Sequence, residues 1–400
     1  VYTVQDGSPQ LEFALTTAVD SADNIYIGGF GFASIDDQPH AGEEDIFLIK
    51  YAADGSKVFT HMAGTTGYDA GIDLTVDTDD NIYLIGNTDG NLNGQLNANP
   101  GSTDCFLMKF NSSGSLQFTV LSGSAADESA FAVAVDNRDG SIYVVGHTAG
   151  NFYDASSGGE DIFLLKYFSN GTMQYSFLTG SSGDDMAYHL DIDSLGSIYI
   201  TGATDGDLHD QVNAGGLDIF LIKYSQNGTR VYTILQGTAE DDEGYSVSID
   251  VYDDVYLAGY SYGDLNGLAN AGSADIFLMK YEPDGLQVFT QLYGTEAYED
   301  GYSIVVDPNG LGNIYLTGGT FGNLLGNSNN GQFDIFMLRV DSTGVAVFCE
   351  LSGTMEWDYG YGIAMDTVGN VYVTGYTGGS IDNQQYLGGY DLYFIKYLRD

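Results

Sequence analysis

Apolar and polar positions along this chain alternate, or apolar residues run together over five to seven positions. In residues 71–121 such runs occupy Gly71–Asp77, Asn81–Asn87, Asp104–Phe110 and Leu116–Leu121, with Gly-, Asn- and Ser-rich segments between them. β-Branched and aromatic residues are enriched in the runs, which is typical of strands. No stretch of ten or more residues has an apolar period of 3.6, so the pattern predicts an all-β chain.

The third run recurs seven times. It reads Asp-Ile-Phe-Leu-Ile-Lys-Tyr over Asp45–Tyr51, and the other copies begin at Asp104, Asp161, Asp218, Asp275, Asp334 and Asp391. A fixed period of this length indicates a repeat architecture. Because the run is apolar on both faces, each copy needs cover on both sides. Four-stranded antiparallel sheets packed face to face supply that cover, so we expect a seven-bladed β-propeller that forms a single domain over residues 1–400.

The chain ends favour closure of the last blade over an open solenoid. Val1–Val4 resembles the fourth strand of other repeats, such as Val58–Thr60, and the chain stops at Asp400 just after a third strand. We therefore expect the N-terminal strand to pair with Asp391–Tyr397, since a solenoid would need polar caps that the sequence lacks. The fourth strands should start near positions 1, 58, 117, 174, 231, 288 and 347.

Charge narrows the choice of partners. The chain has 11 Lys and Arg against 56 Asp and Glu, a formal net charge of −45. It should repel nucleic acid and anionic membrane and attract cations. Salt would screen its self-repulsion, which favours an extracellular or cell-surface location. No signal peptide is visible, although Val1 is compatible with a removed one. The two cysteines, Cys105 and Cys349, fall in distant repeats and are expected to be free thiols.

Most of the basic residues occupy the sixth position of the repeated segment Asp-Ile-Phe-Leu-Ile-Lys-Tyr, which we call the phrase. At this position the aliphatic stem of the side chain should be partly buried between blades. The residues there are Lys50, Lys109, Lys166, Lys223, Lys280, Arg339 and Lys396. A partly buried cation requires an acid. We expect these residues to pair with the aspartates that end the first strands. Those aspartates should also fix the following turns, because their spacing does not match a calcium loop. They are Asp20, Asp77, Asp136, Asp193, Asp250, Asp307 and Asp366.

A further acid precedes each first strand. We expect this set around the mouth of a central channel, where carboxylates of like charge need hydrogen-bond donors or a bound cation. Two interpretations stay open, namely hydrogen bonding within each loop and a metal site that holds Ca²⁺. The set comprises Glu12, Asp69, Glu128, Asp185, Asp242, Glu299 and Asp358.

The repeat resembles the SBBP-type β-propeller repeat over all seven copies. The matching residues of the second copy are Gly64-Thr, Asp69-x-Gly71, Val76-Asp77, Asn81-Ile-Tyr83, Gly86-x-Thr88, Asn91-Leu-Asn-Gly-Gln, Gly101 and Asp104-x-Phe. The resemblance implies the propeller fold and a module of secreted or surface proteins. One departure is Phe or Tyr in the fourth strand, where Trp would be expected in many relatives.

The loops between second and third strands are long and differ between copies, so partner binding is expected there. Aromatic residues beside the acids suit a carbohydrate or partner: Tyr68, Tyr298, Trp357 and Tyr359. Three sequons, at Asn111, Asn170 and Asn227, lie in turns before fourth strands. They are candidate glycosylation sites, and Asn-Gly is also good hairpin chemistry there.

Catalytic motifs are missing from the sequence. It has no Gly-x-Ser-x-Gly elbow, no zinc-protease motif and no phosphate loop, and its five histidines occupy unrelated repeat positions. We therefore expect a non-catalytic extracellular or surface module for adhesion or surface assembly, with a protein or glycan partner or self-assembly. The alternative is a calcium-dependent, lectin-like carbohydrate binder, and the third possibility is a glycosidase that uses a carboxylate pair.

Overall fold

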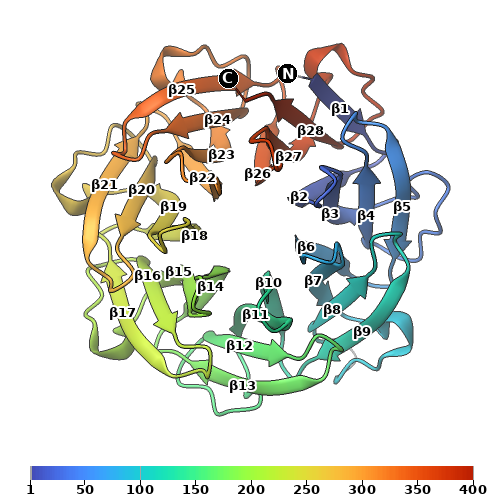
Figure 1. The fold of residues 1–400 in the computed structure, drawn as a ribbon, viewed down its shortest axis with the longest axis horizontal. Coiled ribbons are helices and arrows are strands. Elements are labelled where there is room, and N and C mark those ends of the chain that lie inside the picture. The colour runs from blue at the N-terminus through green and yellow to red at the C-terminus, as the bar shows by residue number, and fades with distance from the viewer. Residues whose placement is uncertain (1, 100, 400) are drawn as a thin grey trace. The chain divides into compact units, whose positions relative to one another are not determined.

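The computed structural model describes residues 2–99 and 101–399 and contains seven four-stranded antiparallel sheets (Figure 1). Each sheet follows chain order from a first to a fourth strand, except the last. The first three sheets comprise β2 (Glu12–Val19), β3 (Ile25–Gly31), β4 (Asp45–Tyr51) and β5 (Lys57–Ala63); β6 (Asp69–Val76), β7 (Ile82–Thr88), β8 (Asp104–Phe110) and β9 (Leu116–Ser122); β10 (Glu128–Asp136), β11 (Ser141–Thr148), β12 (Asp161–Tyr167) and β13 (Met173–Thr179).

The remaining sheets repeat the pattern. They comprise β14 (Asp185–Ile192), β15 (Ile198–Thr204), β16 (Asp218–Tyr224) and β17 (Arg230–Gln236); β18 (Asp242–Ile249), β19 (Val255–Ser261), β20 (Asp275–Tyr281) and β21 (Gln287–Tyr293); β22 (Glu299–Val306), β23 (Ile314–Thr320), β24 (Asp334–Val340) and β25 (Ala346–Ser352); and β26 (Asp358–Met365), β27 (Val371–Thr377), β28 (Asp391–Tyr397) and β1 (Tyr2–Asp6). The fold class is the seven-bladed β-propeller that the sequence predicts, and fourth strands begin within a residue or so of the expected positions.

The N-terminal strand joins the last blade as expected. β1 pairs antiparallel with β28, with Tyr2 opposite Lys396 and Asp6 opposite Leu392. Val1, which the sequence prediction included in this strand, lies outside the described residues. The sheet order β1-β28-β27-β26 confirms that the first strand of the chain supplies the fourth strand of the last blade.

By internal contacts the chain divides into two compact units. Unit 1 contains residues 1–156, 160–179 and 364–400, and unit 2 contains residues 157–159 and 180–363. Unit 1 thus holds the first three blades with most of the last, and unit 2 holds the fourth, fifth and sixth blades with the start of β26. The prediction of a single domain over the whole chain stays a prediction.

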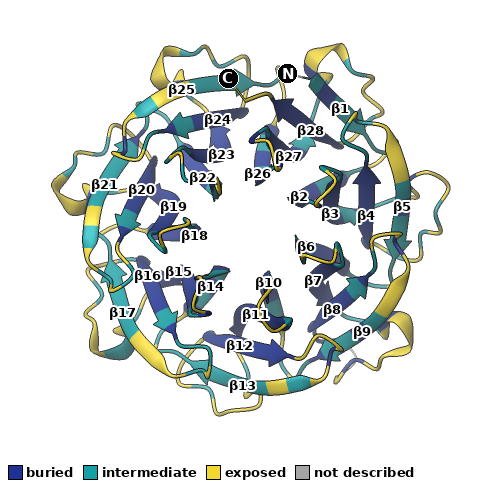
Figure 2. Ribbon diagram, viewed as in Figure 1, coloured by how far each residue is buried: buried dark blue, intermediate teal, exposed yellow. Residues whose placement is uncertain are grey.

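Burial differs between the third and the fourth strand of a blade (Figure 2). The third strand β4 is buried at every position, whereas the fourth strand β5 begins with exposed residues. Within each unit, hydrophobic cores form where consecutive sheets pack face to face. In one of them Ile46 and Leu48 of the first blade contact Leu84 and Phe106 of the second. This arrangement explains why the repeated phrase is apolar on both faces.

Short 3₁₀ turns punctuate five of the long loops after second strands in the described part of the chain. Each begins with a buried Leu or Ile that anchors the loop: η1 (Leu92–Gly94), η2 (Leu208–Asp210), η3 (Leu265–Gly267), η4 (Leu324–Gly326) and η5 (Ile381–Asn383). The aspartate that begins the phrase fixes the end of the long loop before it. In the first blade, Oδ2 of Asp45 accepts the Ala41 N–H at 2.7 Å. Its other oxygen lies against Gly64, where a β-carbon would come within 2.2 Å.

Both cysteines are free, as expected, since Cys105 is buried and Cys349 is partly buried without a disulfide. Burial raises the pKa of the Cys105 thiol well above its usual value, which makes this thiol unreactive.

Candidate binding surface

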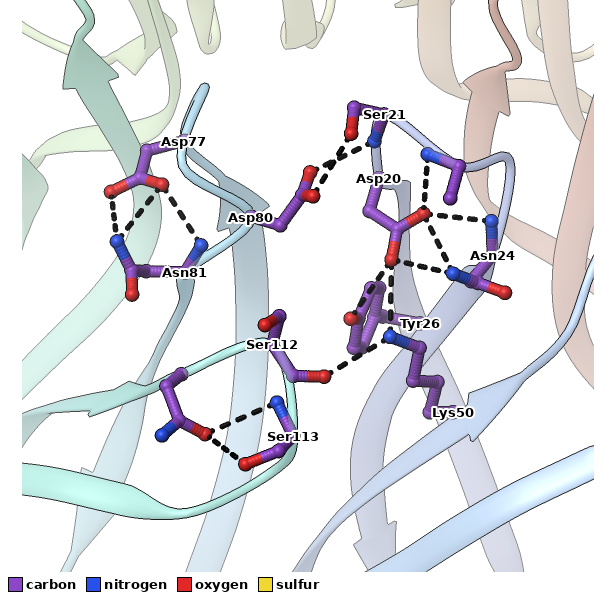
Figure 3. A network of polar contacts seen from close by, with 12 residues as sticks. Asp20, Ser21, Asn24, Tyr26, Lys50, Asp77, Asp80, Asn81, Ser112 and Ser113 are labelled. Carbon is purple, nitrogen blue, oxygen red and sulfur yellow. Dashed lines mark hydrogen bonds and ion pairs between the residues drawn. The ribbon is translucent and has the colours of Figure 1, made fainter.

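A buried polar triad in the first blade combines three side chains (Figure 3). They are the lysine of the phrase, the aspartate that follows the end of the first strand, and a tyrosine of the second strand. The Lys50 ammonium lies 3.1 Å from Oδ2 of Asp20 and 4.7 Å from the ring centroid of Tyr26. The Tyr26 hydroxyl donates to the same carboxylate at 3.1 Å. Asp20 also accepts from Asn24, which fixes the turn after the first strand. Although burial opposes it, these hydrogen bonds and the Lys50 ammonium lower the pKa of Asp20.

The triad also ties neighbouring blades together. Lys50 donates to the Ser112 carbonyl of the second blade at 3.1 Å. Beside it, the backbone and hydroxyl of Ser21 both donate to Asp80, again on the second blade (Figure 3). Within unit 1 the repeated cation is therefore a contact between blades as well as a partner for the acid of its own blade.

The predicted pairing of the phrase cations holds in several copies and changes in others. Lys223 and Lys396 lie 3.5 Å from Asp193 and Asp366, which confirms the prediction there. Lys280 pairs instead with Asp254 at 2.7 Å, four residues beyond the expected partner. For Lys109 the prediction is wrong, because within the described residues this lysine donates to the Ser169 carbonyl at 3.3 Å and forms no ion pair.

These two environments make a matched test. Lys50→Met should destabilise the protein by about 2–3 kcal/mol, because Asp20 keeps its other donors but loses its buried counter-ion. Lys109→Met removes the same side chain from the equivalent position of the second blade. No carboxylate loses an ion-pair partner there, so this change should cost about 1 kcal/mol or less. Thermal and urea unfolding of the two variants measure the difference, and equal losses would contradict the ion-pair role.

The acids at the start of the first strands are completely buried. The side chains of Glu12, Asp69, Glu128, Asp185, Asp242, Glu299 and Asp358 are all 0% exposed. Of the two interpretations left open, hydrogen bonding within each loop is confirmed, because the preceding loop folds over each carboxylate and supplies its donors. In the second blade, Asp69 accepts from the Thr65 N–H at 2.5 Å and from the hydroxyls of Thr65 and Thr88.

No three His, Cys, Asp or Glu side chains gather closely enough to hold a metal ion among residues 2–99 and 101–399. A metal-binding role for the acids that begin the first strands stays a prediction. Burial, with the nearby charge of Asp45 as a lesser contribution, raises the pKa of Asp69, while the Thr88 and Thr65 hydrogen bonds oppose this shift.

Three of the four predicted aromatic binding residues come together in unit 2. Tyr298, Trp357 and Tyr359 all contact Phe333, at ring-centroid distances of 5.7, 5.7 and 4.5 Å. Tyr68 lies in unit 1, where its N–H donates to Asp89, and it has no ring contact among the described residues.

The predicted glycosylation sites occupy the turns before fourth strands, as expected from the sequence. Asn170 and Asn227 are exposed, whereas Asn111 is half-buried. The side-chain carbonyl of Asn111 accepts from the N–H groups of Ser113 and Ser115 and so shapes its own turn. Modification of these asparagines stays a prediction.

The contacts of Phe333 belong to a larger set of rings, which we call the aromatic surface. It extends through the starts of first strands, the ends of second strands and the adjoining loops of unit 2. Trp357 is 36% exposed, and Phe321 and Tyr262 are each 38% exposed, so the set reaches solvent. Its members are Tyr245, Tyr260, Tyr262, Tyr298, Tyr302, Phe321, Phe333, Trp357 and Tyr359.

Two carboxylates are embedded in the aromatic surface. Both occupy the repeat position just after the acid that begins the first strand. Glu243 accepts from the Tyr260 hydroxyl at 2.5 Å and from the Tyr245 hydroxyl at 3.3 Å. Asp300 is 1% exposed and accepts from the Gly319 N–H at 2.9 Å. Burial raises the pKa of Asp300 to about 7, while the Gly319 N–H and the hydroxyls of Tyr302 and Tyr298 oppose this shift.

Asp300 should therefore make stability depend on pH. The folded state holds the carboxyl proton more tightly than the unfolded state, so the stabilisation by the neutral group is lost as pH rises from about 4 through about 7. A pKa raised from 3.8 to about 7 corresponds to at most about 4 kcal/mol. Asp300→Asn keeps the acceptor for Gly319 and should melt above the wild type at pH 8, with the difference vanishing near pH 4. A pH-independent difference would contradict this assignment, and Asp284→Asn at an exposed turn is the control.

Unit 1 has a smaller aromatic set at equivalent repeat positions. Phe13 contacts Phe30 at 5.0 Å and Tyr376 at 4.8 Å, and Phe32 and Tyr390 complete the set. Phe13 and Phe30 occupy the register positions of Glu243 and Tyr260. This set therefore lacks the tyrosine–carboxylate pair that distinguishes unit 2.

Unit 1 also contains a hollow of about 390 Å³ beside the β8–β9 turn. Its walls include Leu48, Met62, Met108 and Leu116 together with His61, whose pKa burial lowers. The lining is mostly apolar and has no acidic or permanently cationic group, so the aromatic surface offers the richer binding chemistry.

Sequence reasoning missed Glu243, Asp300, Tyr260, Tyr262 and Phe333. Their signal was present as a break in the repeat. The position after the first-strand acid holds Phe13, Ala70, Ser129, Met186, Glu243, Asp300 and Tyr359 in the seven copies. Only the fifth and sixth copies carry an acid there, and both lie in the aromatic surface.

Comparison with known proteins agrees with this architecture. The family model of the SBBP β-propeller repeat matches residues 174–209 and 358–382. A protein of unknown function from Dyadobacter fermentans, known from its crystal structure, aligns with 100% of this chain and 98% of its own at 11% identity and a TM-score of 0.50, which is a likeness of fold alone. The chain is therefore a seven-bladed β-propeller. Two of its segments, residues 174–209 and 358–382, are similar to the SBBP-type repeat.

Two curated proteins are similar in sequence. The regulatory protein FlaEY of Caulobacter vibrioides is 28% identical over 43% of this chain, and the uncharacterized WD repeat-containing protein L264 of Acanthamoeba polyphaga mimivirus is 22% identical over 94% of it. The chain spans only 18% and 31% of the lengths of these relatives. No helix in the described residues is both long and apolar enough to span a membrane.

Proposed function

We propose that the protein is a non-catalytic extracellular or cell-surface interaction module, acting in adhesion or within a surface assembly, and that the aromatic surface contacts its partner. The observation that carries the proposal is the exposure of Trp357, Phe321 and Tyr262 at the edge of one continuous set of rings. Large aromatic side chains are enriched where proteins bind each other, and they dominate the binding energy. The regulatory role named for one relative is compatible with a binding function.

An extracellular setting is supported by the net charge of −45, since dissolved salt screens the repulsion between acids. The same charge disfavours nucleic acid and anionic lipid as partners. Antibody staining of intact and permeabilised source cells tests the location, and signal only after permeabilisation would overturn it.

Binding of the labelled protein to intact source cells and to their isolated surface fraction tests the interaction. A Trp357→Ala/Phe321→Ala variant should bind at least tenfold more weakly, because truncation of an aromatic residue that anchors an interface typically costs about 2 kcal/mol. A Leu195→Ala/Val212→Ala variant, which changes two exposed apolar side chains of the same unit outside the aromatic surface, is the control. Unchanged binding by the aromatic variant, with melting curves showing that it is folded, would overturn the proposal.

A calcium-dependent carbohydrate-binding role is the second candidate. It is favoured by the near-parallel rings of Trp357, Phe333 and Tyr359, whose planes differ by 4–15°. Parallel faces of this kind suit the flat faces of sugar rings. A glycan array read with calcium and with chelator tests it, and binding that is lost on chelation and by Trp357→Ala would favour this role over protein interaction.

A further inference from the structure

We propose that the aromatic surface takes up cationic side chains, lysine or arginine, from a basic segment of a partner protein, and that one of them lies beside Glu243. This inference rests on the proposed function, because it names the chemistry of the partner at the same surface. It is argued from a motif that the chain uses repeatedly in its own interior.

The interior motif combines a tyrosine ring, a carboxylate and an ammonium group. The Tyr199 hydroxyl donates to Asp193 at 3.2 Å, and the Lys223 ammonium lies 3.5 Å from that carboxylate and 4.7 Å from the ring centroid. The same three partners recur as Tyr26, Asp20 and Lys50, and as Tyr372, Asp366 and Lys396. In each case the cation completes a tyrosine–carboxylate pair both electrostatically and by contact with the ring face.

The aromatic surface contains such a pair without its cation. The Tyr260 hydroxyl donates to Oε1 of Glu243 at 2.5 Å, and the Tyr245 hydroxyl donates to Oε2 at 3.3 Å. Within the part of the chain that the structure describes, Glu243 forms no ion pair, and no Lys or Arg lies over the ring of Tyr245 or Tyr260. A carboxylate that is 9% exposed and lacks a counter-ion is a strong attractor for an incoming cation.

The surroundings of the pair favour a basic protein segment. The aromatic surface itself contains no lysine or arginine, and the whole chain has only 11 such residues against 56 acids. Long-range attraction therefore speeds the approach of a positively charged segment, and complementary charge selects it over neutral or acidic ones. A sugar could stack on the parallel rings, but it would leave the charge of Glu243 uncompensated.

A chain of ring contacts connects the Tyr260–Glu243 pair to a tryptophan whose fluorescence can report binding. Trp357 is the only tryptophan of the chain. It is linked to Tyr260 through Phe333 and Tyr298, with successive ring centroids 5.7–5.9 Å apart. A basic peptide that lies along these rings from Glu243 to Trp357 should change the tryptophan fluorescence on binding.

The experiment titrates the full chain with a hexa-arginine peptide at about 0.15 M salt, where general attraction between exposed charges is largely screened. Hexa-lysine, hexa-glutamine and a neutral chito-oligosaccharide are the comparison probes. We expect saturable changes in Trp357 fluorescence with hexa-arginine and hexa-lysine and none with hexa-glutamine. Glu243→Gln, which keeps an acceptor for Tyr260, should weaken hexa-arginine binding about tenfold.

Two further variants keep the test decisive. Asp284→Asn removes one charge from an exposed turn of the same unit and should change affinity less than twofold. Tyr262→Leu removes an exposed ring next to Tyr260 and should weaken binding about threefold. Melting curves establish that every variant is folded.

Equal weakening by Glu243→Gln and Asp284→Asn would overturn the inference, because it would show attraction to the net charge alone. A fluorescence change with the oligosaccharide but not with hexa-arginine would also overturn it, and it would leave the aromatic surface as a binding site for sugar. If no probe changes the fluorescence the inference fails, while the cell-binding comparison with the Trp357→Ala/Phe321→Ala variant still decides the proposed function separately.

Discussion

Deletion of residues 1–6 should destabilise the protein by about 5 kcal/mol and lower its melting temperature by about 5–10 °C. The deletion removes β1, which covers the edge of β28 along five paired residues and packs Tyr2 against Phe394. It also removes Asp6, which accepts from the Tyr51 hydroxyl of the first blade at 2.6 Å. An unpaired β28 would leave an apolar strand edge open to aggregation. Circular dichroism melts and light scattering measure both effects.

The same deletion allows a rescue experiment. A synthetic peptide of residues 1–7, added in excess, should restore much of the lost melting temperature, because its binding to the folded state is coupled to stability. A peptide in which Tyr2 and Val4 are replaced by serine should not restore it. A truncated protein that melts like the wild type would contradict the role of β1 in completing the last blade.

Replacement of a buried first-strand acid should have the second large effect. Asp69→Ala leaves the N–H and hydroxyl of Thr65 and the hydroxyl of Thr88 without their acceptor in a site with no solvent access. Unsatisfied buried donors cost about 1–3 kcal/mol each, so a loss of about 4 kcal/mol is expected after partial relaxation. Thermal and urea unfolding check the value.

Asp69→Asn separates the hydrogen-bonding role from the charge. It keeps one carbonyl oxygen and removes the repulsion from Asp45, so it should cost no more than about 1–2 kcal/mol. A loss as large as that of Asp69→Ala would show that the charge itself is needed. Melts with millimolar calcium and with chelator test the predicted metal role, since a bound ion would raise the melting temperature of the wild type but not of Asp69→Asn.

Much of the fold could be read from the pattern of residues. Asp45–Tyr51 and its copies are predicted as third strands and form them, because an apolar run with β-branched residues encodes a strand locally. The pairing of Lys50 with Asp20 could also be predicted, since strand direction places both at one end of a blade. Lys109 escaped the prediction because its ammonium reaches the Ser169 carbonyl instead, and that distance depends on how two blades pack.

The candidate binding surface was only partly predictable. Tyr298, Trp357 and Tyr359 were chosen for their place beside an acid, and the structure brings them together around Phe333. Glu243 went unnoticed among 56 acids, since the break in the repeat at its position gains a meaning only from its contact with Tyr260. The sequence left open whether the acids at the starts of the first strands bond within their own loops or bind a metal, because a sequence does not show how tightly a loop such as Thr65–Tyr68 folds over its own carboxylate.

The sequence by itself determined the number of blades, the order of strands, the strand that completes the last blade and the type of charge that the protein carries. These properties follow from period, apolar pattern and composition, which are local or additive along the chain. Only the tertiary structure decided which acids are buried and which rings form one surface. Tyr245, Tyr298 and Trp357 are more than 50 residues apart from one another, and they meet because consecutive sheets stack face to face at distances set by side-chain packing.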